Sequence, residues 1–232
     1  MDKKILEVGY SDFRKIVANN NYFVDKTMLI YDLFTQGAYI SLMPRPKRFG
    51  KTLNLSMIEH FFDIQKPESA KLFSDFKISE KKDFCKKHQN KYPVINISLK
   101  DIKKTNWDKC YESFKDTIVE LYRKHKYLLE SEKLDSFDKK RFTDIISETA
   151  SEIKYETSLQ NLSEYLKKHF DKDVIILVDE YDAPIINAFK NTPKPIKREK
   201  GNTTYYENVI NFMQTFLGKA YKGNDNNLKK DF

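Results

Sequence analysis

The chain has 232 residues, of which 40% are hydrophobic and 14% aromatic, so it can form one globular domain with a sizeable core and is too apolar to be disordered. No segment is apolar for long enough to cross a membrane, and the first residues, MDKKILEVGY, lack the apolar run of a secretory signal, so we expect a cytoplasmic protein with no membrane partner. The net charge of +8, from 42 basic and 34 acidic residues, favours anionic partners such as nucleotides or nucleic acid, although a lysine-rich solvated surface would also account for it.

The first part of the chain predicts two helices, a strand, a loop and a further helix. Helical patterns cover residues 10–19 and 27–36, with Thr27 placed to cap the second helix and Gly37 placed to end it. The apolar run AYISLM at 38–43 predicts a strand. After the loop that follows, apolar residues recur at helical spacing: Leu53, Met57, Ile58, Phe61 and Phe62. The loop is therefore expected to join a strand to a helix, which is the context that a phosphate-binding loop needs.

The rest of the chain predicts two more strands among helices. The first of these strands is expected in YPVINISL at 92–99, after a polar stretch at 63–91. Val174–Val178 is a run of five apolar residues without polar alternation, which predicts a strand buried on both faces of a parallel sheet. The segment KNTPKPIKREKGN predicts a mobile surface loop. Helices are expected at 107–129, 138–153, 159–170 and 203–217. This order predicts an α/β fold with parallel strand pairing.

The loop RPKRFGKT at 45–52 ends in residues suited to a nucleoside triphosphate. Phe49, Gly50, Lys51 and Thr52 can present consecutive backbone N–H groups at the start of a helix, where the helix dipole also favours an anion. Glycine at position 50 tolerates unusual backbone angles and the close approach of a phosphate. We expect Lys51 to be the cation on the β- and γ-phosphates of ATP and Thr52 to be a Mg²⁺ ligand.

The upstream half of this loop departs from the usual GxxxxGK[ST] pattern. Arg45 replaces the first glycine, and Pro46 removes an N–H donor and pushes Arg45 towards an extended conformation. Arg45, Lys47 and Arg48 either add positive charge near the phosphates or point into water. The GKT residues alone are therefore an unspecific signal of nucleotide binding.

A second motif lies at the end of the buried strand VIILVDE. Asp179 is expected to anchor Mg²⁺ through water, and Glu180 to orient or deprotonate the attacking water. The alternative is that these are ordinary acidic loop residues without a catalytic role. The nucleotide-binding hypothesis requires Gly50-Lys51-Thr52 and Asp179-Glu180 to face one another across one cleft.

With both motifs in view, the sequence resembles the AAA-ATPase-like family of bacterial proteins that often carry a C-terminal PD-(D/E)XK nuclease-like domain. The matching strings are YFVDKT at 22–27, RPKRFGKTLNLSM at 45–57 with HFF after it, and VDEYDAPI at 178–185. The resemblance covers nearly the whole chain, and the arginine in place of the first glycine also resembles that family. It implies a P-loop NTPase fold of the ASCE (AAA-like) class, a three-layer sandwich with a mostly parallel sheet that binds ATP and Mg²⁺.

The same resemblance implies that Asp25 and Lys26 lie near the nucleotide and that Asp182 joins the acidic cluster, although structural roles suit these three residues equally well. The implied fold also places another strand between the loop strand and the strand with the acidic pair. Residues after 217 offer no further apolar run, so we expect 1–217 to form a P-loop domain that lacks its C-terminal strands, and 218–232 a polar tail. A fragment of a longer protein or a shortened homologue would explain this, with a partner copy or another segment filling the gap unless the strands meet directly.

Three functions remain open on this sequence. The first is a Mg²⁺-dependent ATP-binding protein, an ATPase with weak or conditional hydrolysis, because no arginine finger can be assigned. The second is a nucleic-acid-associated regulatory or defence protein that works with a nuclease-like domain. The third is a non-hydrolysing interaction module.

Overall fold

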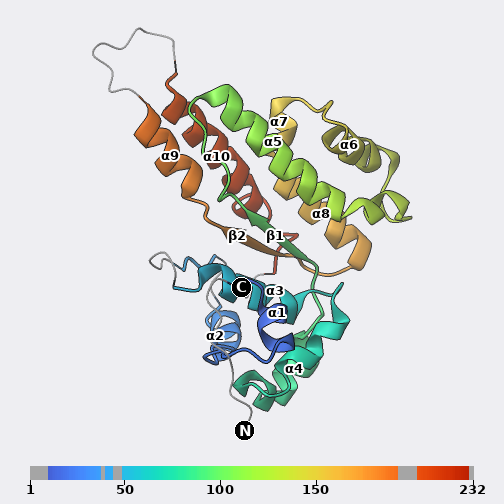
Figure 1. The fold of residues 1–232 in the computed structure, drawn as a ribbon. Helices are drawn as coiled ribbons and strands as arrows, with labels where there is room; N and C mark the ends of the chain where they lie inside the picture. The colour runs from blue at the N-terminus through green and yellow to red at the C-terminus, as the bar shows by residue number, and fades with distance from the viewer. Residues whose placement is uncertain (1–9, 38–39, 44–48, 193–202, 230–232) are drawn as a thin grey trace. The chain divides into compact units, whose positions relative to one another are not determined.

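A computed structural model describes residues 10–37, 40–43, 49–192 and 203–229 (Figure 1). The loop residues Arg45 and Arg48 and the proline- and lysine-rich residues 193–202 lie outside the described part of the chain. The chain divides into two compact units. The first unit comprises Met1–Ile95, Lys172–Leu177 and Leu228–Phe232, and the second unit comprises Asn96–Asp171 and Val178–Asn227. Each unit has its own buried apolar interior.

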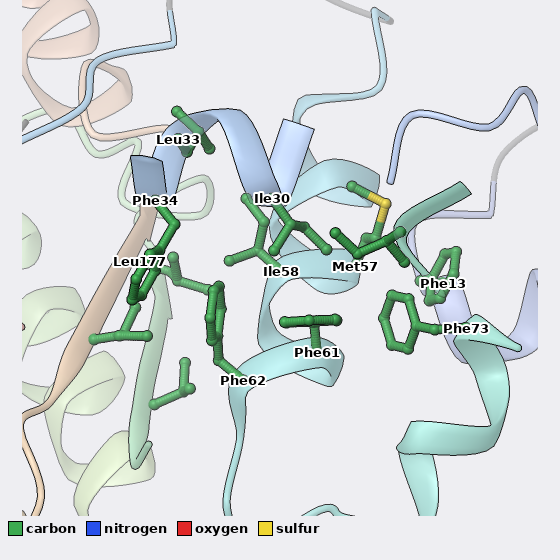
Figure 2. Packing of buried hydrophobic residues seen from close by; sticks show 13 residues of the cluster. Phe13, Ile30, Leu33, Phe34, Met57, Ile58, Phe61, Phe62, Phe73 and Leu177 are labelled. Atoms are coloured by element: carbon green, nitrogen blue, oxygen red, sulfur yellow. The ribbon is translucent and has the colours of Figure 1, made fainter. Parts of the chain in front are cut away.

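The first unit packs short helices around an aromatic core. Its helices are α1 (Phe13–Ala18), α2 (Met28–Thr35), α3 (Lys51–Phe62), α4 (Lys82–His88) and the 3₁₀ helices η1 (Pro67–Phe73) and η2 (Lys77–Glu80). Met57, Ile58, Phe61 and Phe62 of α3 are fully buried, and α1 and η1 pack against that helix (Figure 2). The Phe61 ring lies edge-on to the rings of Phe62 at 5.0 Å and Phe73 at 5.2 Å. Such ring pairs stabilise by about 0.5–1.5 kcal/mol beyond area burial, so the C-terminal half of α3 is firmly fixed.

The second unit is mainly helical. Its helices are α5 (Trp107–Lys124), η3 (Lys126–Glu130), α6 (Ser136–Ile146), α7 (Glu152–Glu156), α8 (Ser158–Phe170), α9 (Ala183–Asn191) and α10 (Tyr205–Tyr221). α10 packs against α5, α7, α8 and α9 (Figure 1). Its buried Phe212 ring lies 4.5 Å from the Phe114 ring of α5. The Lys168 ammonium of α8 donates to the buried Asp138 carboxylate of α6 at 2.8 Å, which ties these two helices together.

The strands β1 (Val94–Ser98) and β2 (Ile175–Asp179) form a two-stranded parallel sheet. The Ile175 N–H donates to the Pro93 carbonyl and the Leu99 N–H donates to the Asp179 carbonyl, both at 3.0 Å. In a parallel ladder these bonds make Ser98 the direct neighbour of Asp179. Because successive side chains alternate between faces, Ser98 and Asp179 lie on the same face of the sheet.

The structure confirms most of the predicted elements and the coarse fold class, a mixed α/β chain with parallel strand pairing. Five predicted helices correspond to helices of the structure: 10–19 to α1, 27–36 to α2, 107–129 to α5, 159–170 to α8 and 203–217 to α10. The helix predicted after the loop is α3. The strands predicted at 92–99 and 174–178 are β1 and β2. Ile175 and Leu177 of β2 are buried, but Ile176 and Val178 are only half-buried. The prediction that the strand is buried on both faces was therefore wrong for the face that carries Ile176 and Val178. Among the described residues, no helix has the length and apolarity needed to span a bilayer.

Two predicted elements were wrong. The single helix predicted at 138–153 is divided, because Glu148 has a φ of +62° that an α-helix cannot contain, and the chain resumes a helix only at Glu152. The strand predicted at 38–43 is absent from its described residues, 40–43. Ile40 and Leu42 there are 49% and 64% exposed, and in the described residues they have no neighbouring strand, so neither burial nor a hydrogen-bond ladder stabilises an extended strand. Helix α9 was not predicted.

Candidate functional site

The predicted phosphate-binding residues lie at the start of α3. Gly50 is the residue before the helix and has φ +76° and ψ +23°, the left-handed region that a side chain disfavours. Among the described residues, apart from its chain neighbours, no heavy atom lies within 4 Å of the position that a Cβ would take, so the backbone angle and not crowding requires glycine there. The helical ladder begins with the Asn54 N–H, which donates to the Gly50 carbonyl at 2.9 Å. The backbone N–H groups of the preceding residues therefore point beyond the end of the helix, in the direction from which an anion would approach.

The side chains of this helix start are accessible, unlike those farther along α3. Thr52 is exposed, Lys51 is half-buried and the Phe49 ring is 60% exposed. Met57 and Phe61, two turns later, are fully buried in the first unit. The helix therefore offers a rigid frame with a solvent-facing first turn, an arrangement that suits recognition of a ligand by backbone groups.

Asp25 belongs to a hydrogen-bond network within the first unit. Its carboxylate accepts from the Thr27 N–H at 2.9 Å, the Thr27 hydroxyl at 2.7 Å and the Lys77 N–H at 2.8 Å. Burial acts to raise the pKa of Asp25, but these hydrogen bonds outweigh it and hold that pKa below its ordinary value. The Thr27 hydroxyl in turn accepts from the Ile78 N–H at 3.2 Å. These contacts give Asp25 a structural role in joining the segment before α2 to η2, while Lys26 is exposed.

The acidic motif follows β2 in the second unit. Asp179, the last residue of the strand, is 5% exposed, and its carbonyl accepts from Leu99 of the neighbouring segment. Glu180 is half-buried and has a φ of +52°, which costs a residue with a side chain about 1–2 kcal/mol. Its carbonyl accepts from the Ala183 N–H at 3.0 Å and closes the turn into α9. The strained turn fixes where the Glu180 side chain leaves the backbone.

Asp182 occupies the N-cap position of α9, but its side chain makes no capping hydrogen bond. The Asp182 carbonyl accepts from the Ile186 N–H at 2.9 Å as the first bond of the helix. Pro184 stands in the first turn, where its missing N–H costs no helical hydrogen bond. The sequence DEYDAP therefore forms a compact strand–turn–helix connection.

Two polar residues of β1 were missed by sequence reasoning. Asn96 and Ser98 lie on the same face of β1 because they are two residues apart, and Ser98 is the direct neighbour of Asp179. The Ser98 hydroxyl oxygen is buried and has no hydrogen-bond partner in the described part of the protein. The signal was present in VINIS, where Asn96 and Ser98 alternate with isoleucines. Ligands of parallel α/β sheets commonly bind at the carboxyl ends of the strands, where Ser98 and Asp179 lie.

Each motif contains a side chain of the type that a hard divalent cation binds, Thr52 in the first unit and Asp179 in the second. The Thr52 hydroxyl and the Asp179 carboxylate are oxygen ligands of the kind that Mg²⁺ prefers, and Mg²⁺ often keeps several waters and few protein ligands. Within the described residues, no three His, Cys, Asp or Glu side chains cluster closely enough to hold a metal by themselves. Gly50-Lys51-Thr52 belong to the first unit and Asp179-Glu180 to the second, and their meeting across one cleft stays a prediction.

Comparison with known proteins identifies relatives over most of the chain. A family model described as "Predicted AAA-ATPase" matches residues 7–232. A protein of Azotobacter chroococcum mcd 1, described as "Uncharacterized protein in vnfD 5'region", is 26% identical over 193 residues. The match covers 81% of this chain and 31% of that protein, so the chain spans less than a third of the length of this relative. No solved structure matches the chain.

Proposed function

Because the chain belongs to the predicted AAA-ATPase family, we propose that it is a Mg²⁺-dependent ATP-binding protein whose hydrolysis is weak or conditional. The proposal includes a P-loop fold of the ASCE class and a cytoplasmic location. The observation that carries it is the start of α3, where a left-handed glycine stands directly before a lysine and a threonine in the first helical turn. That combination presents backbone N–H groups, a cation and a hydroxyl to the same end of one helix.

Each residue at the helix start has a distinct role in the proposal. Gly50 lets the backbone approach the phosphates, and the N–H groups of Lys51 and Thr52 donate to phosphate oxygens. The Lys51 ammonium offsets charge on the β- and γ-phosphates, and the Thr52 hydroxyl reaches the cation. Phe49 contributes through its backbone, and Arg45 and Arg48 add positive charge upstream. Asp25 is retained here as a residue that shapes the first unit, in view of its three hydrogen bonds.

The acidic motif supplies the second half of the proposed site. Asp179 would hold the cation through water, and the cation would neutralise charge on the terminal phosphates when bound. Glu180 would accept a proton from the attacking water, with its position set by the strained turn after β2. Hydrolysis is expected to be slow, because an arginine finger contributes about 10³–10⁵ in rate and none is assigned here.

Nucleotide binding tests the proposal directly. A fluorescent ATP analogue with Mg²⁺ should bind the wild type, and Lys51→Ala should weaken binding by at least about tenfold, the effect of losing one charge-assisted hydrogen bond. Lys71→Ala is the matched control, because Lys71 is an exposed lysine in the same unit. Equal affinities of the wild type and Lys51→Ala for the ATP analogue would refute the proposal.

A double-mutant cycle tests whether the two motifs serve one cation. Thr52→Ala and Asp179→Asn should each reduce the Mg²⁺ dependence of ATP binding, and the double variant should lose less than the sum because both act on the same ion. If the losses of the two single variants add up in the double variant, the two motifs do not act on the same cation. Glu180→Gln should keep ATP binding and abolish hydrolysis.

A non-hydrolysing interaction module is the second candidate function, and the effect of nucleotide on stability distinguishes it from the first. Mg-ATP at about 100 times its Kd should stabilise the wild type by about 2.7 kcal/mol if the nucleotide binds the folded state. An unchanged melting temperature at that excess would favour the module. For both candidate functions, the proposed protein partner is a second copy of this chain or a nuclease-like domain.

A further inference from the structure

A run of positive charge in the first unit, apart from that of the loop before α3, extends from Lys77 to Lys91, across η2 and α4. This segment carries six lysines against two acidic residues, a net charge of +4, which is half of the +8 of the whole chain. Lys82, Lys86 and Lys87 of α4 are all exposed, as is Lys91 after the helix, and we refer to the three lysines of α4 as the α4 lysine surface.

The backbone beneath the α4 lysine surface is held by aromatic packing. α4 turns Phe84, Cys85 and His88 inward, and His88 is buried. The Phe84 ring lies 5.1 Å from the Tyr31 ring and 5.3 Å from the Phe34 ring, both edge-on. Helical periodicity then places Lys82, Lys86 and Lys87 on the opposite side of α4. The charges therefore project from a fixed frame.

Protein carboxylates do not neutralise this surface. No carboxylate of the described residues pairs with Lys82, Lys86, Lys87 or Lys91. By contrast, Lys168 pairs with both Asp138 and Glu164 at 2.8 Å. Lys82, Lys86 and Lys87 lie on one side of a helix of seven residues, so their like charges repel one another, and a polyanion would relieve that repulsion.

We propose that the α4 lysine surface binds the phosphate backbone of duplex nucleic acid without reading its sequence. Lys82 and Lys86 are one turn apart, about 6 Å along the helix, and duplex DNA carries a negative charge every ~1.7 Å of its axis, so each ammonium finds a phosphate within reach. Glu80 and Asp83 flank these lysines and repel phosphate, which limits the affinity and makes it depend on low salt.

The composition of the segment separates a duplex from other polyanions. None of the exposed large hydrophobic side chains of the described residues falls between Lys77 and Lys91. A surface that inserts into lipid would carry such side chains beside its lysines, and one that stacks single-stranded bases would carry exposed aromatic rings. Backbone contact with a duplex needs neither.

Salt-dependent binding to DNA tests this inference independently of nucleotide binding. A fluorescein-labelled DNA duplex should bind the wild type, with affinity falling as salt rises from about 50 to 200 mM. The triple variant Lys82→Gln, Lys86→Gln, Lys87→Gln should reduce the slope of log K against log salt by about 2.7, since each phosphate contact contributes about 0.9. ATP binding should not change in this variant.

The matched control removes three charges from the second unit, with Lys124→Gln, Lys126→Gln and Lys140→Gln, all exposed residues. It should keep the wild-type slope. Equal losses in both triple variants would mean that net charge alone drives binding and would overturn the inference. Absence of duplex binding at low salt would overturn it too, as would binding of the surface to anionic phospholipid vesicles without binding to DNA. Unchanged circular dichroism and melting temperature would show that the variants are folded.

Discussion

Ser98 and Asp179 are direct neighbours in the parallel sheet, with both side chains on the same face at the carboxyl ends of β1 and β2. Asp179 is buried, and the Ser98 hydroxyl is buried without a hydrogen-bond partner in the described residues. A buried hydroxyl without a partner costs about 1–3 kcal/mol in a folded protein, so such groups call for a bound water or ligand. The pair is therefore a polar position at the carboxyl end of a mostly apolar sheet.

Replacing Ser98 tests that its hydroxyl does not stabilise the fold. Ser98→Ala should leave the free energy of unfolding unchanged or raise it by up to about 1 kcal/mol, because an unsatisfied polar atom is removed. Ser158→Ala is the matched control: the buried Ser158 hydroxyl donates to the Tyr155 carbonyl at 2.7 Å, and its loss should cost about 1 kcal/mol. Urea unfolding measures both. A loss in Ser98→Ala equal to that in Ser158→Ala would show that Ser98 has a structural partner.

Replacing glycine by alanine should change the free energy of unfolding in opposite directions at two positions. Gly50→Ala should lower the free energy of unfolding by about 1–2 kcal/mol, because residue 50 must keep a φ near +76°. Gly218 lies inside α10 with open space around its Cβ position, so Gly218→Ala should raise the free energy by about 0.5–1 kcal/mol. Denaturant titration of both variants checks the pair. Stabilisation by Gly50→Ala would mean that the left-handed angle is not needed.

Asp25 is expected to matter for stability and not for nucleotide affinity. Asp25→Asn removes the charge that accepts from Thr27 and Lys77 and should cost about 1–2 kcal/mol. Since the folded-state pKa of Asp25 is lowered, its contribution is present above the unfolded-state pKa and is lost as the pH falls through the folded-state pKa. Asp32→Asn, at an exposed position of α2, controls for the lost charge. A drop in ATP affinity with unchanged melting would instead place Asp25 at the nucleotide.

Local patterns in the sequence were sufficient for most helices and for β1 and β2, because apolar periodicity reports which face of an element is buried. The same reasoning failed at 38–43, where apolar residues suggested a strand but Ile40 and Leu42 are exposed and have no strand neighbour in the described residues. A strand needs a partner strand, which often lies far away in the chain, so its apolar residues alone cannot predict it.

The candidate site shows the same division between local and long-range information. The need for glycine at position 50 was predictable from GKT and is confirmed by its left-handed backbone. The pairing of Ser98 with Asp179 joins residues far apart in the chain, and no local pattern specifies which strand lies next to which. Helix α9 was missed because the acidic residues and Pro184 of DEYDAP look like a loop, although proline in the first turn is compatible with a helix.

His60 should make the stability of the protein fall in mild acid. Its buried ring contacts the Ser69 hydroxyl at 3.0 Å and the Asp12 carboxylate at 3.5 Å, with Lys66 and Glu59 nearby. Burial lowers the pKa of His60, Lys66 adds to this, and Glu59 and Asp12 oppose it. Because the folded-state pKa is lowered, the contribution is complete above the unfolded value of about 6.5 and is lost as the pH falls through the folded-state pKa. His60→Gln should therefore flatten the pH dependence of the free energy of unfolding below pH ~6.5, by at most one proton, or about 1.4 kcal/mol per pH unit. Urea unfolding across that pH range measures the slope of the free energy of unfolding against pH. His169→Gln is the comparison, because the pKa of His169 is also lowered. An identical slope in the wild type and in His60→Gln would assign the acid sensitivity to other groups.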